Sequence, residues 1–220
     1  MRFKKVTYHV QVAEMLRDMI MTGKLAEGDK VNEGELCETM GISKTPLREA
    51  LRVLSVEGLI RLVPNRGAFV TKPTFEEIAE MFDVMSLLEG YCARAACEKM
   101  TTKDFTRLEK LHAKLEDNFE QRDQEEYIRI NNRYHSLVQE IAGNRALNQI
   151  VDGLRKKILL YRFQSLNLPA RFECSIREHR NLLDAFRKRD QSRAESVMRD
   201  HLHNQSQALE TLVEQSTAAT

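Results

Sequence analysis

Three basic side chains recur every four residues in the stretch ISKTPLREALRVLSVEG, residues 42–58: Lys44, Arg48 and Arg52. Residues at this spacing lie on one face of a helix, so the cations would form a stripe beside an apolar face. Ser43 or Thr45 can cap the first turn, which places small hydroxyls beside long cations. Such a helix end suits contacts with phosphates and base edges. An ordinary solvated basic face explains the stretch equally well.

Three histidines form a second group of chemically capable residues. His135, His179 and His201 lie in NNRYHSL, IREHRNL and MRDHLHN, on three different expected helices. Asn131 precedes His135 by four residues and therefore shares its helical face. The residues alone do not show that the three histidines converge, and they favour the simpler interpretation of satisfied structural histidines. The other histidines, interpreted as ordinary surface or cap residues, are His9, His112 and His203.

The elements that must position the basic stripe follow a recognisable order. Apolar residues at helical spacing predict a helix that stops at Gly23, a short helix that stops at Gly41, and then the basic helix. Two β-rich runs, Leu59–Val63 and Ala68–Thr71, follow, with Arg66 near the tip of the turn between them. Helix, helix, turn, helix and hairpin is the order of a winged helix-turn-helix.

The histidines fall in a second, entirely helical part of the chain. Pro73 and a capping box from Thr74 to Glu77 mark the boundary, which predicts domains over 1–72 and 73–220. The pattern predicts six helices and no strand beyond it, over 75–99, 103–121, 124–142, 145–164, 170–188 and 191–216. The expected fold is therefore mainly α, with an N-terminal winged helix-turn-helix and a C-terminal all-α six-helix bundle.

Composition limits the class of protein. Hydrophobic residues make up 42% and charged residues 30% of the 220 residues, with nine glycines and four prolines, as in a helical globular protein. No apolar run approaches the ~20 residues that span a bilayer. The N-terminus lacks the apolar core of a signal peptide, and the four cysteines form no CxxC pair. We therefore expect a cytoplasmic protein with reduced thiols and no membrane partner.

The charge is unevenly distributed along the chain. Residues 1–72 carry 12 basic and 9 acidic side chains, whereas residues 73–220 carry 22 and 24. Within residues 43–72 the basic side chains outnumber the acidic ones by six to two. This surplus coincides with the basic helix and its hairpin, which indicates a nucleic-acid contact at that end of the chain.

The stretch KLAEGDKVNEGELCETMGISKTPLREALRVLSVEGLIRLVPNRGAFV resembles the DNA-binding domain of GntR-family bacterial transcription regulators. The resemblance makes the basic helix the recognition helix. The residues that it places on DNA are Ser43, Lys44, Thr45 and Arg48, with Arg66 and Gly67 of the wing. Lys44 replaces the usual arginine and cannot form the bidentate fork to guanine, so the preferred operator would differ at one base.

The helical half resembles the FCD ligand-binding domain of the FadR-type branch of these regulators. The family pattern D-x-x-F-H, E-H and M-x-x-H appears here as Asn131-x-x-Tyr134-His135, Glu178-His179 and Met198-x-x-His201. The resemblance implies that Asn131, His135, His179 and His201 bind a divalent metal, zinc first, with nickel or manganese as alternatives. Asn131 is neutral where the family has an aspartate. Weaker metal binding and stronger attraction of an anionic effector would follow. The alternative is a metal-free, histidine-lined pocket.

The resemblance also bears on the effector. Many FCD sequences carry an arginine four residues before the glutamate of their first bundle helix, and those positions are Met85 and Glu89 here. The carboxylate clamp is therefore missing or is supplied elsewhere at the effector site. Arg162 is a candidate because it continues the Leu154–Ile158 face of its helix. A solvated or snorkelling Arg162 is the simpler interpretation.

These observations predict a transcription regulator, not an enzyme. It would repress by binding a palindromic operator in double-stranded DNA as a homodimer, under control of a small-molecule carboxylate. A metal-dependent enzyme or a metal-free ligand sensor tethered to DNA is the alternative. The chain lacks an H-E-x-x-H motif and an obvious general base. A non-specific nucleoid protein would need a stronger basic field than the net charge of +1 provides.

Overall fold

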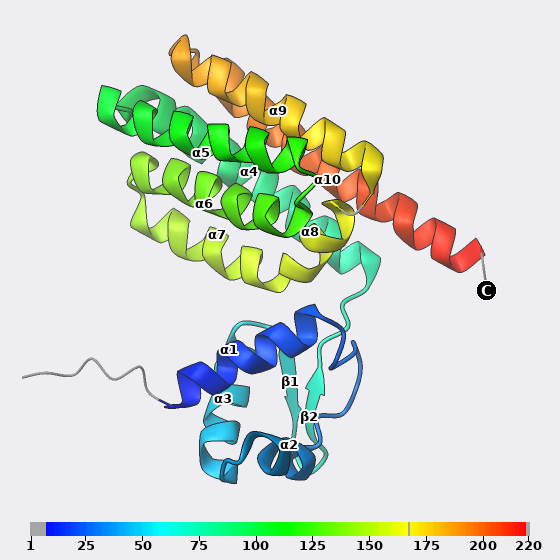
Figure 1. Cartoon of the computed structure of the whole chain (residues 1–220). Helices are drawn as coiled ribbons and strands as arrows, with labels where there is room; N and C mark the ends of the chain where they lie inside the picture. Colours follow the sequence, from blue (N-terminus) through cyan, green and yellow to red (C-terminus); the bar gives the residue numbers. More distant parts are fainter. Residues whose placement is uncertain (1–7, 167, 219–220) are drawn as a thin grey trace, which may run out of the picture. The chain divides into compact units, whose positions relative to one another are not determined.

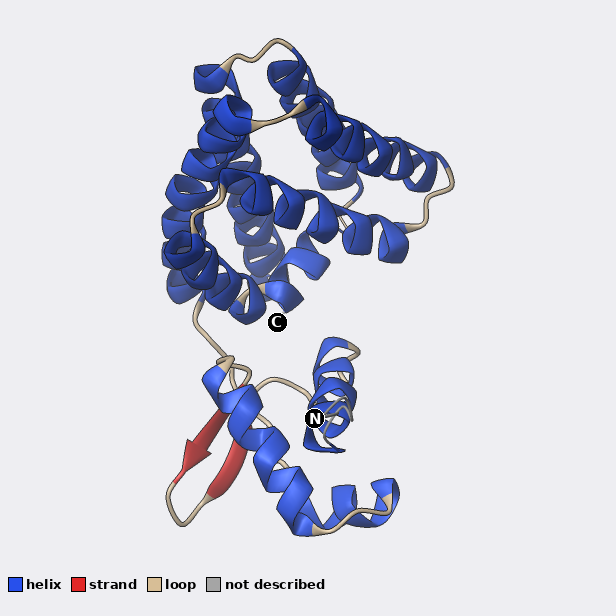
Figure 2. Ribbon diagram, turned by 90° about the vertical axis from the view of Figure 1, so that its left-hand side faces the viewer, coloured by secondary structure: helices blue, strands red, loops and turns tan. Residues whose placement is uncertain are grey.

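The computed structural model describes residues 8–166 and 168–218. The chain divides into two compact units between Pro73 and Thr74. We call them the N-terminal unit and the helical unit, and each is described by itself. The secondary structure of both is shown in Figure 2.

The N-terminal unit consists of three helices and a two-stranded hairpin. The helices are α1 (Tyr8–Met21), α2 (Glu33–Met40) and α3 (Lys44–Val56). Strands β1 (Ile60–Val63) and β2 (Gly67–Val70) pair antiparallel, with Ile60 opposite Val70 and Val63 opposite Gly67. Leu16, Leu47, Leu51 and Leu54 are buried in the core that joins the helices to the hairpin. Figure 1 shows the arrangement of these elements.

Local sequence signals explain the ends of these elements. The Asn32 side chain accepts a hydrogen bond from the Glu35 amide and caps α2. Gly41 ends α2 in the left-handed conformation, with φ of 64°. The hairpin turn also needs positive φ, 57° at Asn65 and 100° at Gly67, which suits an asparagine and a glycine. The predicted winged helix-turn-helix is confirmed.

The helical unit contains seven helices within the described residues. They are α4 (Phe75–Lys99), α5 (Thr102–Glu120), α6 (Gln124–Ala142), α7 (Arg145–Lys157), α8 (Leu159–Leu166), α9 (Pro169–Arg187) and α10 (Gln191–Ala218). Capping boxes at Thr74 and Thr101 begin α4 and α5. The predicted all-α bundle is confirmed. Among the described helices, none combines the length and the apolar character that a membrane span requires.

One predicted helix was wrong in its extent. The segment 145–164, predicted as a single helix, is divided at Ile158, where φ is −99° and ψ is 8°. Ile158 and Tyr161 pack in an apolar cluster with Phe82 and Met85 of α4. Arg155, three residues before Ile158, binds the carboxylate of Glu89, which also lies on α4. Tertiary packing therefore redirects a chain whose local pattern is continuous.

Helices α4 and α10 make the most extensive helix–helix packing of the helical unit, and they lie behind α5 and α6 in Figure 1. Gly90 permits their close approach, because a Cβ atom there would lie 2.5 Å from Arg199 Cγ and 3.3 Å from the Glu195 carbonyl oxygen. The main apolar core combines side chains of this pair with others from α5, α6, α7 and α9. The polar residues described next lie inside that framework.

Candidate functional site

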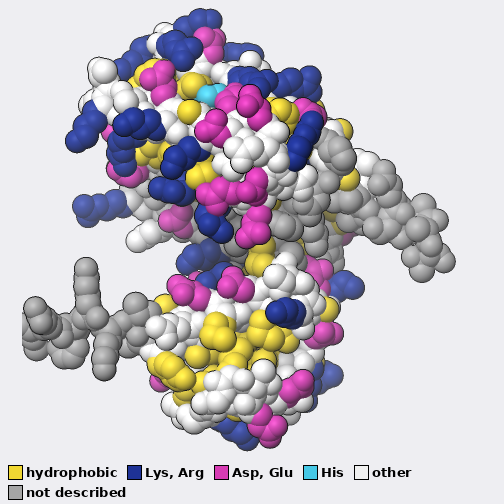
Figure 3. Space-filling model, in the orientation of Figure 1, with side chains coloured by type: hydrophobic (Ala, Val, Ile, Leu, Met, Phe, Trp, Pro, Cys, Tyr) yellow, Lys and Arg dark blue, Asp and Glu magenta, His cyan; other side chains and the backbone are white. Residues whose placement is uncertain are grey.

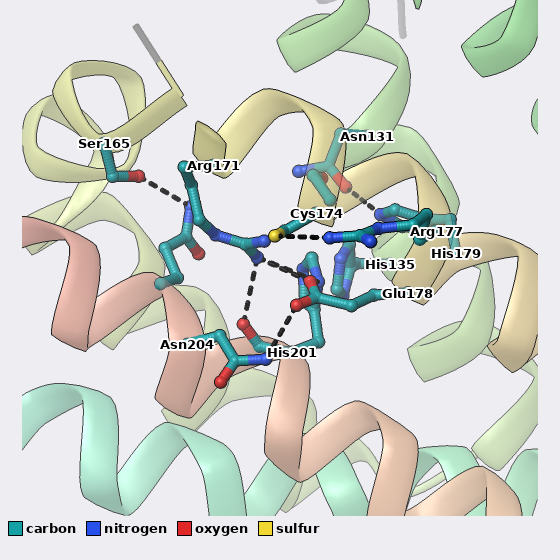
Figure 4. Close-up of polar contacts among 12 residues, drawn as sticks. Asn131, His135, Ser165, Arg171, Cys174, Arg177, Glu178, His179, His201 and Asn204 are labelled. Carbon is teal, nitrogen blue, oxygen red and sulfur yellow. Dashed lines mark hydrogen bonds and ion pairs between the residues drawn. The ribbon is translucent and has the colours of Figure 1, made fainter. Parts of the chain in front are cut away.

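The structure brings the three predicted histidines together inside the helical unit. His135 of α6, His179 of α9 and His201 of α10 are all buried, and their ring centroids lie 5.0 to 5.4 Å apart. One ring nitrogen of each lies within 4.8 Å of those of the other two. Figure 4 shows the rings beside Asn131, Arg171 and Glu178. The sequence alone did not show that the three histidines converge, and the structure places them in one cluster.

Each histidine is held by a hydrogen bond on one ring nitrogen. Nδ1 of His135 lies 2.9 Å from Glu89 Oε2, and Nδ1 of His201 lies 2.7 Å from Glu178 Oε2. Nε2 of His179 lies 2.7 Å from the amide oxygen of Asn131. Ionised carboxylate and amide oxygens only accept, so the bonded nitrogens donate and the lone pair of each neutral ring resides on the other nitrogen. At His201 Nδ1 the contact with Glu178 is shorter than the 3.3 Å contact with Arg171 Nη2, so Glu178 sets the tautomer.

Those other nitrogens have no partner within the described residues: His135 Nε2, His179 Nδ1 and His201 Nε2. Burial lowers the pKa of His135 to about 3, although Glu89 opposes the shift. Burial likewise lowers the pKa values of His179 and His201. The rings are therefore neutral near pH 7, and their lone pairs are available.

These residues fit a divalent metal. Buried polar atoms normally have a partner, and three unpartnered nitrogens in one cluster are a marked exception. A neutral imidazole whose other nitrogen donates to a carboxylate or amide is the usual arrangement of a metal-bound histidine. Three nitrogen ligands suit zinc or nickel.

Asn131 lies in this cluster, and its amide oxygen contacts His179 Nε2. In that position it orients the imidazole. Its assignment as a fourth ligand stays a prediction.

Two arginines that were not predicted neutralise the carboxylates behind the histidines. Arg155 donates to both oxygens of Glu89, with Nε to Oε1 at 2.8 Å and Nη2 to Oε2 at 2.5 Å. Arg171 Nη2 donates to Glu178 Oε2 at 2.7 Å. Although burial raises the pKa of Glu89, the charge of Arg155 holds it well below its usual range. Burial also opposes ionisation of Glu178, but His201 and Arg171 bring its pKa to about 2.

A sequence signal existed for both arginines. Arg155 follows Leu147 and Val151 at intervals of four, so it continues a buried stripe of α7. Arg171 precedes Glu178 by seven residues, or two helical turns, on α9.

The residues proposed for the effector are all buried, but they differ in their surroundings. Met85 lies in an apolar cluster, and Glu89 is occupied by Arg155 and His135. Arg162 of α8 is 2% exposed, so the interpretation of a solvated side chain was wrong. Its three guanidinium nitrogens have no hydrogen-bond partner within the described residues. Burial, followed by the charge of Arg155, lowers the pKa of Arg162 to about 9.

His112 was also misjudged as a surface or cap residue. It is 8% exposed on α5 and lies with Nε2 3.0 Å from Glu116 Oε1. Burial lowers its pKa, against the opposing effect of Glu116.

The predicted DNA-contacting residues lie on the recognition helix and the hairpin of the N-terminal unit. Ser43 occupies the N-cap position of α3, but its side chain makes no capping bond. Its neighbours Lys44 and Thr45, with Arg48, are exposed. Arg48 joins Arg66 and Gly67 of the wing in lining a groove of about 560 Å³. The structure therefore connects the helix and the wing along one exposed surface.

Arg48 is held in place by a neighbouring helix. Its Nε donates to Glu33 Oε2 of α2 at 2.8 Å.

In contrast to the basic stripe of α3, basic and acidic side chains are intermixed on the visible face of the helical unit (Figure 3). This mixture argues against non-specific binding by a continuous basic field.

A winged helix-turn-helix followed by a helical unit with a buried polar cluster is the arrangement expected of a helix-turn-helix transcription regulator. Residues 9–70 match the bacterial regulatory proteins of the gntR family, and residues 80–204 match the FCD domain. The chain belongs to the GntR family and carries an FCD domain. Members of this family are transcription regulators and not enzymes.

Individual relatives agree with this assignment over nearly the whole chain. The uncharacterized HTH-type transcriptional regulator YdhC of Bacillus subtilis is 25% identical over 96% of this chain and 95% of its own. The HTH-type transcriptional repressor RspR of Escherichia coli is 24% identical over 94% of this chain and 91% of its own.

Solved structures show the same fold. Escherichia coli McbR/YncC aligns with a TM-score of 0.79 at 22% identity, covering 95% of this chain and all of its own. A GntR regulator from Rhodococcus aligns with a TM-score of 0.75 at 19% identity, covering 93% and 99%.

Proposed function

We propose that this protein is a sequence-specific repressor whose operator affinity is set by a small organic acid bound in the helical unit at a divalent metal. The N-terminal domain over 1–72 would bind DNA, and the domain over 73–220 would bind the effector and dimerise. The observation that carries the proposal is the set of three unpartnered, buried ring nitrogens on α6, α9 and α10. The assignment to repression is supported by the name of the relative RspR.

On the DNA side, the exposed first turn of α3 would enter the major groove. Lys44 and Arg48 would contact base edges or phosphates, Ser43 and Thr45 would donate hydroxyl hydrogen bonds, and Arg66 with Gly67 would follow the backbone. Glu33 orients Arg48 through its 2.8 Å bond and limits the rotamers that Arg48 samples before binding. One recognition helix contacts only a few base pairs, so a homodimer on a palindrome supplies the required affinity.

On the effector side, this chain would hold the metal with His135, His179 and His201, and Asn131 is the candidate fourth ligand. Glu89 and Glu178 fix the tautomers of two imidazoles, and Arg155 and Arg171 keep those carboxylates ionised. When bound, a divalent ion supplies a positive centre for a carboxylate. The acid controls DNA binding if it has different affinities for the two dimer geometries that fit and miss the half-sites.

Thermal unfolding of chelator-treated protein tests the metal site. Zinc, nickel or manganese should raise the melting temperature of the wild type, because a ligand at 100 times its Kd stabilises the folded state by ~2.7 kcal/mol. The shift should disappear in His179→Ala and persist in the matched control His203→Ala, an exposed histidine on α10. A direct response to an acid without any metal response would favour the metal-free pocket.

Selection of bound duplexes from a random pool tests DNA recognition. We expect an enriched palindrome, with half-sites about one helical turn apart, bound by a dimer in size-exclusion chromatography. Enrichment of no motif, together with a steep salt dependence, would instead support non-specific binding.

A further inference from the structure

Arg162 is a buried cation with which no carboxylate of the described residues pairs. It is 2% exposed, and within the described residues Nε, Nη1 and Nη2 all lack a hydrogen-bond partner. The other two arginines of this interior are compensated, because Arg155 binds Glu89 and Arg171 binds Glu178. An unpaired buried charge is costly, so its presence in a folded protein calls for an explanation by function.

Arg162 belongs to the same interior as the histidine cluster. Its helix α8 packs against α6, α9 and α10, the three helices that carry His135, His179 and His201. Ser165 lies one turn after Arg162 on α8, and Gln205 lies one turn after His201 on α10. The Ser165 hydroxyl accepts a hydrogen bond from the Gln205 amide, which joins the two helices next to these residues.

The number of unpartnered donors exceeds what one carboxylate can satisfy. Arg162 leaves all of its roughly five N–H bonds without an acceptor. Arg171 leaves Nε and Nη1 unpartnered, which adds about three more N–H bonds. A single carboxylate offers about four acceptor positions, and a metal on the histidines would occupy part of them.

We infer that the effector is a small dicarboxylate, with one carboxylate at the histidine cluster and the second bound by the guanidinium of Arg162. This inference rests on the proposed acid-responsive function and narrows the class of acid. Arg162 contributes a planar fork that matches a carboxylate, and Arg171 offers its remaining donors to the same ligand. Two anionic groups also balance the site better than one, because three buried arginines face only two carboxylates even before a metal adds its charge.

The inference predicts a trade between stability and binding at one residue. Arg162→Met removes an uncompensated buried charge and fills similar space, so the ligand-free variant should melt at least about 2 °C higher than the wild type. A structural arginine would show the opposite sign. The matched control is Arg129→Met, because Arg129 is exposed on α6 and pairs only with Glu125 and Glu126 among the described ion pairs.

The experiment measures thermal shifts of zinc-loaded wild type, Arg162→Met and Arg129→Met with succinate, malate and glutarate, each beside its monoamide. We expect at least one diacid to stabilise the wild type and the Arg129→Met control. Its monoamide should need at least about tenfold higher concentration for the same shift, the equivalent of one lost charged hydrogen-bonded contact. Arg162→Met should lose this preference for the diacid.

Four results would overturn the inference. These are a lower melting temperature for ligand-free Arg162→Met, an unchanged diacid preference in that variant, an equal response of the wild type to diacid and monoamide, and no response to any diacid at about 10 mM. An equal response of the wild type to the diacid and its monoamide would refute the dicarboxylate but would still be consistent with a regulator that responds to an acid. Failure of the regulator itself would be seen separately, as operator binding by the wild type that no acid changes.

Discussion

Removal of the Glu89 carboxylate should be one of the most destabilising single changes in the helical unit. Glu89 is 1% exposed, and its two oxygens accept from Arg155 at 2.8 and 2.5 Å and from His135 at 2.9 Å. Glu89→Ala leaves the Arg155 guanidinium buried without its partner and removes the acceptor of His135 Nδ1. Breaking a buried pair on one side costs about 3–5 kcal/mol. For a protein of this size that corresponds to a fall of about 6–20 °C in melting temperature.

Urea unfolding of zinc-free protein, followed by far-ultraviolet circular dichroism, measures this loss. The matched control is Glu173→Ala, which removes an ion pair with Arg122 at 2.6 Å whose two side chains are exposed. That pair should contribute no more than about 1 kcal/mol. The double variant Glu89→Met with Arg155→Met should recover most of the loss, because two buried charges are then replaced by apolar side chains. Equal unfolding midpoints for Glu89→Ala and Glu173→Ala would refute the reasoning.

The same position separates packing from metal chemistry. Glu89→Gln keeps an oxygen that can accept from His135 Nδ1, whereas Glu89→Ala does not. Loss of such an orienting partner usually costs 10–100-fold in metal affinity. We therefore expect zinc affinity to fall in the order wild type, Glu89→Gln, Glu89→Ala. An unchanged zinc affinity in Glu89→Ala would show that His135 does not bind the ion.

Three further predictions concern separate parts of the molecule. Gly90→Val should destabilise the helical unit by about 1–3 kcal/mol, because the added side chain would contact Arg199 and the Glu195 carbonyl. Gly153→Ala should stabilise α7 by about 0.5–1 kcal/mol, because no atom lies within 4 Å of the added Cβ. Chemical denaturation measures both changes in the free energy of unfolding. His112 has a lowered pKa in the folded state, so the unfolded chain takes up its proton first, and stability present above about pH 6.5 should decline as the pH falls below it. His112→Asn should show a shallower decline between about pH 7 and pH 5, and an identical slope would contradict the burial effect. Lys44→Arg should change the preferred base at one position of each half-site, without changing the salt dependence of DNA binding. Fluorescence anisotropy on the selected operator and its single-base variants measures both. The same base preference in both proteins would show that Lys44 does not contact a base.

Much of the fold could be predicted because its signals are local. Capping boxes, glycine stops and helical periodicity depend on residues three or four apart, and they located the boundaries of α4 and α6 to the residue. The division at Ile158 could not be predicted, because it depends on the contacts of Ile158 and Tyr161 with α4, about 80 residues earlier in the chain.

The candidate site shows the same division between local and distant information. The histidines were located through a family pattern, since each lies on a different helix. Arg155 and Glu89 are 66 residues apart, and no sequence spacing relates them. For Arg162 the local pattern showed the correct face of the helix, but only tertiary packing reveals that this face is buried and that no described acceptor meets the guanidinium.

Asn131 permits a final prediction, which concerns the coupling of metal and effector. The carboxylates nearest the histidines, Glu89 and Glu178, are each neutralised by an arginine. A metal bound by His135, His179, His201 and Asn131 would therefore receive its first net negative charge from the effector. Zinc and the acid should then each increase the other's affinity by the same factor, because binding linkage is reciprocal.

Asn131→Asp should weaken this coupling. Two opposite unit charges 4 Å apart attract by about 4 kcal/mol at an effective dielectric constant of 20, so even a small part of that interaction raises zinc affinity at least tenfold. The aspartate would also reduce the positive charge that attracts the acid, and the zinc affinity of the variant should depend less on added acid. Competition with a chromophoric chelator, with and without the acid, measures both effects. An Asn131→Asp variant that binds zinc no more tightly than the wild type would show that residue 131 orients His179 without contacting the ion.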